Sequence, residues 1–420
     1  MSAMKTNGND LSLLRDLAKQ YAEIAAKPVQ EERRDLWRRH FSLKRTRPPV
    51  LITYGMHNVW CRDTFSADNM ECEDPFLRWY ERWLRMQIFH DAIGDDYICE
   101  PWIPQAAAYK TPWGLYGEAW GMGLKLQHTG DEGGAFKLEG TIAAWEDMVK
   151  LKPPAHEIDE DATASNCERL GEAIGDILEI DVSRSPVLIN FAGDISTTVT
   201  GLRGLEQIML DMYDSPVQLR ELLSCLRDGV LENQGAAEAA GDFSLTSQSN
   251  QAMTYAEELE APKPNSGARK RNALWGFCAA QEYALVSPAF HEEFLLKYQM
   301  PIMAPYGLVH YGCCEDLTQK IDMLRQIPNL RSIAVTPRAD VRKCADQIGK
   351  DYVVSWRPNP TDMVCTNWDP DRVTRIIRGG AEACRDSIFH IYLKDVETVQ
   401  GEPQRLQRWT QQVRAALEQA

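Results

Sequence analysis

Short apolar runs recur along the chain, and a polar turn and a stretch of helical periodicity follow most of them. Continuous apolar runs bounded by turns are typical of parallel strands that are buried on both faces, and less typical of half-exposed antiparallel strands. Eight such runs can be recognised. The predicted strands are residues 50–54, 96–99, 186–191, 273–278, 307–311, 330–335, 351–355 and 387–393.

Helical patterns lie between these runs, and each has an acidic residue or a serine near its start, as a helix cap or a partner of the helix dipole would be placed. The alternation of strand and helix, repeated eight times, predicts an α/β fold with a single, closed (β/α)8 TIM barrel. Examples of the predicted helices are residues 205–223, 288–297, 316–326, 340–348 and 369–384.

Three stretches do not fit the alternation. Residues 1–45 have an amphipathic helical pattern and predict a helical extension, so that the barrel itself spans residues 46–420. Residues 102–154 are rich in glycine and tryptophan and predict an excursion of short hairpins after the second strand. Residues 244–271 are polar and predict a long loop before the fourth strand, and long loops in compact domains are often functional lids.

Charge and targeting signals narrow the possible partners. The formal net charge is −15, and so acidic a surface repels phosphate backbones, which argues against nucleic acid as a partner. The N-terminus lacks the apolar core of a signal peptide, and no apolar stretch approaches the roughly 20 residues that a membrane span needs. We therefore expect a cytoplasmic protein without a membrane partner, in which most of the eleven cysteines are free thiols.

In a (β/α)8 barrel the active site lies at the carboxyl ends of the strands, and this rule selects the candidate residues. The catalytic candidates are Asp194, Glu282, His310, Lys394 and Asp395. The substrate-binding candidates are His57, Asn58, Glu100, Trp102, Trp356 and Arg357.

The densest segment is HYGCCE, which places a histidine, two thiols and a carboxylate at the end of the fifth predicted strand. Imidazole and thiolate are common zinc ligands, so we expect His310 and Cys313 to bind zinc, with Glu282 as the third ligand and Asp395 as an alternative. Simpler interpretations remain open. His310 can bond to a neighbour while the thiols pack in the barrel, or a thiol can act as a nucleophile.

The other candidates also have structural interpretations. Asp194 and Glu282 can be helix caps. Lys394 and Asp395 can form an ion pair at the rim of the barrel. The aromatic residues of the excursion can line a large, flat ligand or close the edge of the barrel. These aromatic residues are Trp102, Tyr109, Trp113, Tyr116 and Trp120.

Several phrases resemble the uroporphyrinogen decarboxylase superfamily, in the same order along residues 45–420. They are INFAGDISTTVTGLRGLEQIMLDMYDSPVQLRELL, VSPAFHEEFLLKYQMPIM, VHYGCCEDLTQKIDML and GEPQRLQRWTQQVRAAL. The resemblance implies either decarboxylation of a tetrapyrrole without a cofactor, or zinc-dependent methyl transfer in which the partner is a corrinoid protein.

The sequence departs from both activities. Where the decarboxylases carry a Met-Arg-Gln-Ala-Gly-Arg phrase, this chain reads GMHNVWCRD, which counts against tetrapyrrole decarboxylation. The methyltransferases bind zinc through His-x-Cys and a later cysteine. Here the spacing from His310 to Cys313 is longer by one residue, and Lys394 and Asp395 lie near the place of the later cysteine.

Three functions follow. The first is a methyltransferase, zinc-dependent, that moves a methyl group between a small carrier and a corrinoid protein. The second is a metal-free decarboxylase or lyase of a carboxylated substrate, with Asp194 or Asp395 as the proton donor. The third is a protein that binds a tetrapyrrole or corrinoid in the mouth of the barrel.

Overall fold

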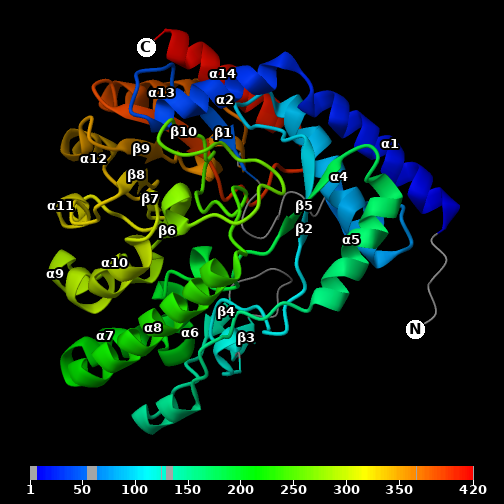
Figure 1. The fold of residues 1–420 in the computed structure, drawn as a ribbon. Helices are drawn as coiled ribbons and strands as arrows, with labels where there is room; N and C mark the ends of the chain where they lie inside the picture. Colours follow the sequence, from blue (N-terminus) through cyan, green and yellow to red (C-terminus); the bar gives the residue numbers. More distant parts are fainter. Residues whose placement is uncertain (1–6, 54–63, 124, 129–135, 366, 420) are drawn as a thin grey trace.

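The centre of the fold is a parallel sheet of six strands that curls into half of a barrel (Figure 1). The computed structural model describes residues 7–53, 64–123, 125–128, 136–365 and 367–419. The strand order is β1-β10-β9-β8-β7-β6, and every neighbouring pair is parallel. The strands are β1 (Val50–Ile52), β6 (Trp275–Cys278), β7 (Leu308–Tyr311), β8 (Leu330–Val335), β9 (Val353–Trp356) and β10 (Ile388–Leu393).

Successive side chains along the strands of the sheet point to opposite faces and pack in different layers. Val335, Trp356 and Leu393 belong to the large apolar core that the sheet forms with its helices. Several positions between such residues are polar although they are also buried, and His310 and His390 are examples. Because side chains alternate along a strand, one face of the sheet packs against helices while the other carries polar groups.

The prediction of a closed (β/α)8 barrel is confirmed in part: the described residues form an α/β half-barrel, and two of the eight predicted strands do not join its sheet. Residues 96–99 and 186–191 are not strands. In their place β2 (Trp102–Ala106) and β5 (Glu179–Ser183) pair with each other in a separate parallel sheet of two strands. The other six predicted strands are confirmed, with small shifts at their ends.

Side chains bond to both edges of the six-stranded sheet. At β1 the Asp96 carboxylate accepts from Val50 N at 2.8 Å, and the Asp95 carboxylate accepts from Ile52 N at 2.7 Å. At β6 the backbone N of Trp275 donates to Gln248 Oε1 at 2.8 Å. A carboxylate or amide that satisfies an edge N–H removes the need for a neighbouring strand, which explains why the sheet stays open.

A second, smaller apolar core lies around β2 and β5. It joins α1 (Gly8–Ala25), α4 (Pro75–Ile93) and α5 (Glu160–Ile174), which lie together on one side of the molecule in Figure 1. The helical extension predicted for residues 1–45 is present as α1 and α2 (Pro28–Phe41). Trp37 of α2 packs in a third cluster beneath the sheet.

Helices α9 to α14 follow the sheet strands and cover the outer face of the half-barrel (Figure 1). The predicted helix 205–223 is divided at Ser215, because Pro216 starts a new helix and restricts the residue before it. The remaining helices are α6 (Ser196–Arg203), α7 (Leu205–Asp214), α8 (Pro216–Ala240), α9 (Pro288–His291), α10 (Lys297–Met303), α11 (Ile321–Leu324), α12 (Val341–Ile348), α13 (Pro370–Ala383) and α14 (Arg405–Glu418). Two π-helical segments span Glu292–Leu296 and Thr361–Cys365.

The excursion contains the antiparallel hairpin of β3 (Leu126–His128) and β4 (Phe136–Leu138). Short 3-10 turns complete the path of the chain. They are Ala67–Asn69, Glu118–Trp120, Trp145–Lys150, Asn190–Ala192, Arg271–Ala273 and Gln281–Tyr283.

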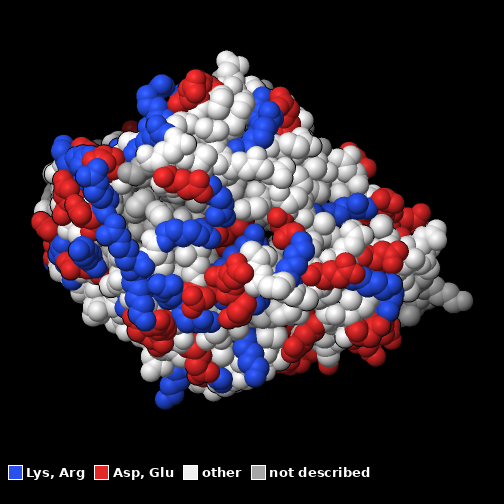
Figure 2. Space-filling view, turned by 90° about the horizontal axis from the view of Figure 1, so that it is seen from above, with Lys and Arg blue, Asp and Glu red and all other residues white. Residues whose placement is uncertain are grey.

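The surface carries both signs of charge. On the face shown in Figure 2, Lys and Arg side chains lie beside Asp and Glu side chains. Among the described helices, none has the length and apolar character that crossing a bilayer requires.

Candidate active site

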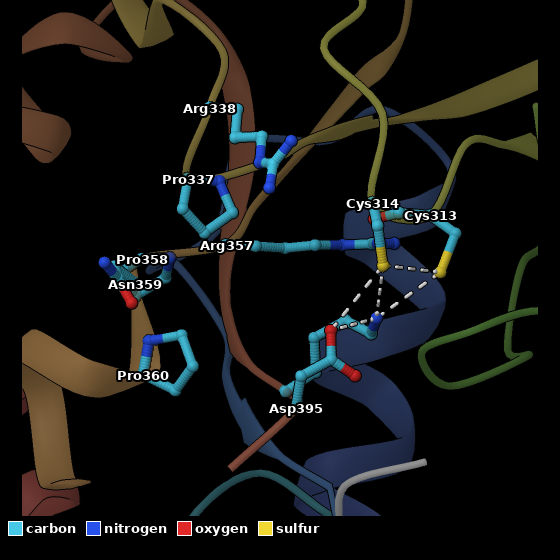
Figure 3. Close-up of a pocket in the computed structure, with 10 residues that line it drawn as sticks. Cys313, Cys314, Pro337, Arg338, Arg357, Pro358, Asn359, Pro360 and Asp395 are labelled. Atoms are coloured by element: carbon cyan, nitrogen blue, oxygen red, sulfur yellow. Dashed lines mark hydrogen bonds and ion pairs between the residues drawn. The ribbon is translucent and has the colours of Figure 1, made fainter. Parts of the chain in front are cut away.

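A cavity of about 320 Å³ lies at the carboxyl ends of four neighbouring strands, where the fold places chemistry (Figure 3). Each of β7, β8, β9 and β10 contributes the residues that follow it directly. We call this the thiol cavity. It is lined by Cys313, Cys314, Pro337, Arg338, Arg357, Pro358, Asn359, Pro360, Lys394 and Asp395.

Two adjacent thiols and one ammonium group form the centre of the cavity. The sulfur atoms of Cys313 and Cys314 are 3.4 Å apart. Lys394 Nζ lies 3.4 Å from Cys313 Sγ and 3.5 Å from Cys314 Sγ, and it donates to Asp395 Oδ2 at 2.6 Å. Cys313 is buried and Cys314 is exposed, so the pair spans the boundary between the protein interior and the cavity.

This environment turns Cys313 into a thiolate at neutral pH. A hydrogen bond from Cys314, together with the positive charges of Lys394 and Arg357, outweighs burial and lowers the pKa of Cys313 to about 6. The same hydrogen bond and burial raise the pKa of Cys314, which stays a thiol. Burial alone would discharge Lys394, but the Cys313 thiolate and Asp395 raise the pKa of its ammonium group. A buried ion pair of thiolate and ammonium results.

The turn after β7 fixes the position of Cys313. Gly312 has φ +101°, a backbone conformation that L side chains rarely adopt, and a Cβ there would lie 2.8 Å from Leu317. The Glu315 carboxylate accepts from the backbone N atoms of Cys313 at 2.8 Å and Ala280 at 2.7 Å, which ties the turn to β6. Arg357 donates to the carbonyl oxygen of Cys313 from the other side.

Asp395 is held in a backbone conformation that non-glycine residues seldom adopt. Its φ is +55°, in the left-handed region. Such conformations cost about 1–3 kcal/mol and are found most often at functional sites. At this position the conformation accompanies the short ion pair between Asp395 and Lys394.

His310 lies behind the thiols and is buried. Its Nε2 is 3.0 Å from Arg357 Nη2 and 3.1 Å from the carbonyl oxygen of Gly312. Burial, followed by the charge of Arg357, holds the pKa of His310 well below its usual range, so the ring is neutral. Its role in this geometry is to position the Arg357 guanidinium group.

Three carboxyl groups form a second cluster on the other side of Cys313. Asp194 is fully buried, and its Oδ2 has no hydrogen-bond partner among the described residues. Glu282 accepts from the hydroxyl groups of Ser196 and Thr197, the latter at 3.1 Å. Burial, with the mutual repulsion of these groups and Glu315, raises the pKa of both Asp194 and Glu282. Among the described residues no cation bonds to Asp194 or Glu282, so burial favours the neutral form of both.

The segment that carries Asp194 is also strained. Asn190 and Ile195 have φ values of +52° and +57°. A positive φ is rare for a β-branched residue such as Ile195. The carbonyl oxygen of Asp194 accepts from Gln299 at 2.7 Å, which holds the segment against the helices outside the sheet.

The residues expected to bind zinc do not fit that ion. His310 Nε2 faces the guanidinium group of Arg357, Cys313 faces the ammonium group of Lys394, and Glu282 is held by two hydroxyl groups. The cation that contacts Cys313, Cys314 and Asp395 is the ammonium group of Lys394. Within the described part of the chain, no three His, Cys, Asp or Glu side chains are arranged to hold a metal ion.

Among the other sequence candidates, the structure brings only Arg357 to the thiol cavity. Glu100 precedes β2 and bonds to Arg34 at 2.9 Å and to Tyr255 at 2.5 Å. Trp102 lies in β2, and Trp356 is buried against α13. His57 and Asn58 lie outside the described residues.

Sequence reasoning missed Arg338 and Asn359, which line the cavity directly after β8 and β9. The strand-end rule was sufficient to find both, since TPR follows the sixth predicted strand and PNP the seventh. With Arg357 and Lys394, Arg338 gives the cavity three cations.

No protein-family model matches the chain. No curated protein matches it either. Among solved structures, a methyltransferase from Methanosarcina mazei aligns with a TM-score of 0.48 and 10% sequence identity, over 92% of this chain and 98% of that chain. We draw no conclusion about activity from a likeness at this level.

Proposed function

We propose that the protein is a methyltransferase in which the Cys313 thiolate takes a methyl group from a small anionic molecule and passes it on. The observation that carries this proposal is the thiolate of Cys313, paired with Lys394 at the edge of a cavity that also holds Arg338 and Arg357. A thiolate, and not a thiol, is the nucleophile in such reactions.

The cations of the cavity bind and orient the donor. Arg338 lines the exposed side of the cavity, whereas Arg357 is fixed by Cys313 and His310. Guanidinium groups recognise carboxylate, phosphate or sulfonate through paired hydrogen bonds. An anionic group bound by Arg338 places the methyl group of a small molecule over the two sulfur atoms.

In the first step, the Cys313 sulfur attacks the methyl carbon of the donor. A carbon–sulfur bond forms, the bond from the methyl group to the donor breaks, and its electron pair leaves with the donor. In the second step, an acceptor nucleophile attacks the same methyl carbon and the Cys313 thiolate is released. The Lys394 ammonium group, already 3.4 Å from the sulfur, stabilises the returning negative charge.

A methyl thioether gives up its methyl group only to a strong nucleophile. A reduced corrinoid presented by a partner protein, the acceptor class that the sequence resemblance implies, has that strength. No step passes through zinc, because His310 and Cys313 face cations and Glu282 is held by two hydroxyl groups.

The test is transfer of isotope-labelled methyl groups followed by mass spectrometry of the Cys313 peptide. Incubation with methylated donors of different anionic groups is expected to add one methyl group to Cys313, and addition of reduced cobalamin is expected to remove it. Cys313→Ser is the matched control. Transfer to cobalamin by the Cys313→Ser variant at the unaltered rate would overturn the proposal.

One observation favours a second function. Asp194 and Glu282 are carboxyl groups whose pKa values are raised by burial, which favours the protonated form that a proton donor in a decarboxylase requires. In a lyase of this kind, Arg338 and Arg357 would bind the substrate carboxylate. This function predicts that Asp194→Asn abolishes turnover and that Cys313→Ser does not, the reverse of the methyltransferase.

A further inference from the structure

A second cavity adjoins the thiol cavity and has no part in the reaction described above. It also has a volume of about 320 Å³, and it shares four wall residues with the thiol cavity. We call it the adjoining cavity. The shared residues are Pro337, Arg357, Pro358 and Asn359.

The walls that belong only to the adjoining cavity include three apolar side chains. Val341 starts α12, Ile376 lies on α13, and both are half-buried apolar side chains at the edge of the main core. Trp356 forms a further wall and contacts Gly380, where a Cβ would overlap its ring. The cation Arg357 is common to both cavities, whereas the charged group of the adjoining cavity alone is the carboxylate Asp362.

The two cavities therefore differ in the ligand chemistry they favour. The thiol cavity carries Arg338 and Lys394 and attracts an anion. The adjoining cavity offers the apolar side chains of Val341 and Ile376, and its carboxylate, Asp362, lies 4.0 Å from Arg372; it can therefore stabilise an uncharged apolar group by removing it from water. Ligand pockets of this kind combine apolar walls with a few polar groups that set the orientation.

We propose that the adjoining cavity binds the apolar part of the substrate, so that the substrate class is amphiphilic: an anionic end at Arg338 and Lys394, and an uncharged aliphatic or flat body among Val341, Trp356 and Ile376. This inference rests on the proposed function for the reaction, and it adds the class of substrate that the site selects. Arg357, with Pro337 and Pro358, forms the rigid passage between the two parts.

Gly379 offers a way to fill the adjoining cavity without disturbing the fold. It lines the cavity from α13, and a Cβ built there meets no heavy atom of the described residues within 4 Å. Replacing a helical glycine also favours the helix. Gly235 of α8 is a matched control, because it too is helical and has open space around its Cβ, yet it lines neither cavity.

The experiment measures how straight-chain carboxylates, from acetate to decanoate, protect Cys313 against iodoacetamide, with Cys313 and Cys314 read separately by peptide mass spectrometry. Protection is expected to strengthen about twofold to fourfold with each added methylene group until the adjoining cavity is full. In Gly379→Leu, acetate should protect as in the parent chain while the gain with chain length disappears. Gly235→Leu should behave as the parent chain, and neither variant should lower Tm.

Protection that does not depend on chain length, or an equal chain-length dependence in Gly379→Leu and the parent chain, would overturn the inference. This measurement needs no turnover. If the methyl-transfer assay fails but protection still depends on chain length, the proposed reaction is rejected and the binding site is retained. If methyl transfer occurs but protection does not depend on chain length, the binding site is rejected and the reaction is retained.

Discussion

Two clusters of ionisable side chains lie on either side of the same turn, and the pKa values of their buried acidic groups are shifted in opposite directions. In the thiol cavity, Lys394 reaches both sulfur atoms and the Asp395 carboxylate, and Cys313 is ionised at neutral pH. In the acidic cluster, Asp194 and Glu282 have hydroxyl and backbone partners but no cation, and their pKa values are raised. Glu315 and Cys313 connect the two clusters.

The comparison shows that burial alone does not decide the charge of a group. Cys313 and Asp194 are both buried almost completely, and burial opposes ionisation of both. A hydrogen bond from Cys314, together with the cations Lys394 and Arg357, reverses the effect for the thiol, whereas no described cation bonds to Asp194 and the pKa of its carboxyl group stays raised. The thiol side is therefore suited to nucleophilic attack, and the acidic side to holding a proton.

The largest expected effect is that of Cys313→Ala. Removing the nucleophile should lower kcat about a thousandfold or more in the methyl-transfer assay, since the other groups of the site act through it. Because Cys313 also packs with Phe277 and Ala279 in a small apolar cluster, and its loss removes a partner of the buried Lys394, Tm should fall modestly. Retained activity would indicate that Asp194 and Glu282, and not the thiols, carry out the reaction.

Lys394→Met should make the two clusters alike by removing the cation from the thiol side. The pKa of Cys313, about 6 with Lys394 in place, should then rise by about one unit or more towards the ordinary range of a thiol. The measurement is the rate of Cys313 alkylation as a function of pH, whose midpoint should move to higher pH. An unchanged midpoint would show that Lys394 does not set the charge of the thiol.

Asp194→Asn tests the acidic side through stability. Because the folded chain raises the pKa of Asp194, its native state keeps a proton that the unfolded chain releases, and the associated stability is lost as pH rises above the ordinary pKa of aspartate. The free energy of unfolding of the variant, relative to the parent chain, should therefore increase by about 1–3 kcal/mol between pH 4 and pH 8. Denaturant unfolding at both pH values measures this.

Asp96→Asn is the control with the opposite sign. Burial would raise the pKa of Asp96, but Arg47 and Arg414 lower it, so the carboxylate stabilises the fold above the ordinary pKa of aspartate and this contribution fades as pH falls. The Asp96→Asn variant should lose more stability at pH 8 than at pH 4. The same trend in both variants would show that the acidic cluster is not held neutral.

The smallest effect is expected for Cys314→Ser. The serine hydroxyl group can still donate a hydrogen bond to the Cys313 thiolate, so the alkylation midpoint of Cys313 should move by less than about half a pH unit, whereas Cys314→Ala should move it further to higher pH. Equal midpoints for the serine and alanine variants would leave Lys394 as the main cause of the lowered pKa.

Much of the architecture followed from the order of apolar and polar residues. Six of the eight predicted strands form the sheet, because a buried parallel strand needs an unbroken apolar run, which is a local property. The two predicted strands that are absent, residues 96–99 and 186–191, would have extended the sheet beyond its edges. At these edges the carboxylates of Asp95 and Asp96 bond to β1, and Gln248 bonds to β6. The local sequence pattern does not distinguish a side chain that hydrogen-bonds to the backbone of an edge strand from one that faces water.

The sequence by itself determined which residues stand at the carboxyl ends of the strands, and it thereby selected Cys313, Arg357, Lys394 and Asp395. Only the tertiary structure decided how they act. Lys394 and Cys313 are separated by 81 positions in the chain, yet the charge of each depends on the 3.4 Å between their side-chain atoms. Electrostatic interaction strengthens as the distance shrinks and as the dielectric constant falls, so the state of a buried thiol is set by its spatial neighbours. For the same reason, the cation amid the thiols is a lysine ammonium group, where the sequence had led us to expect zinc.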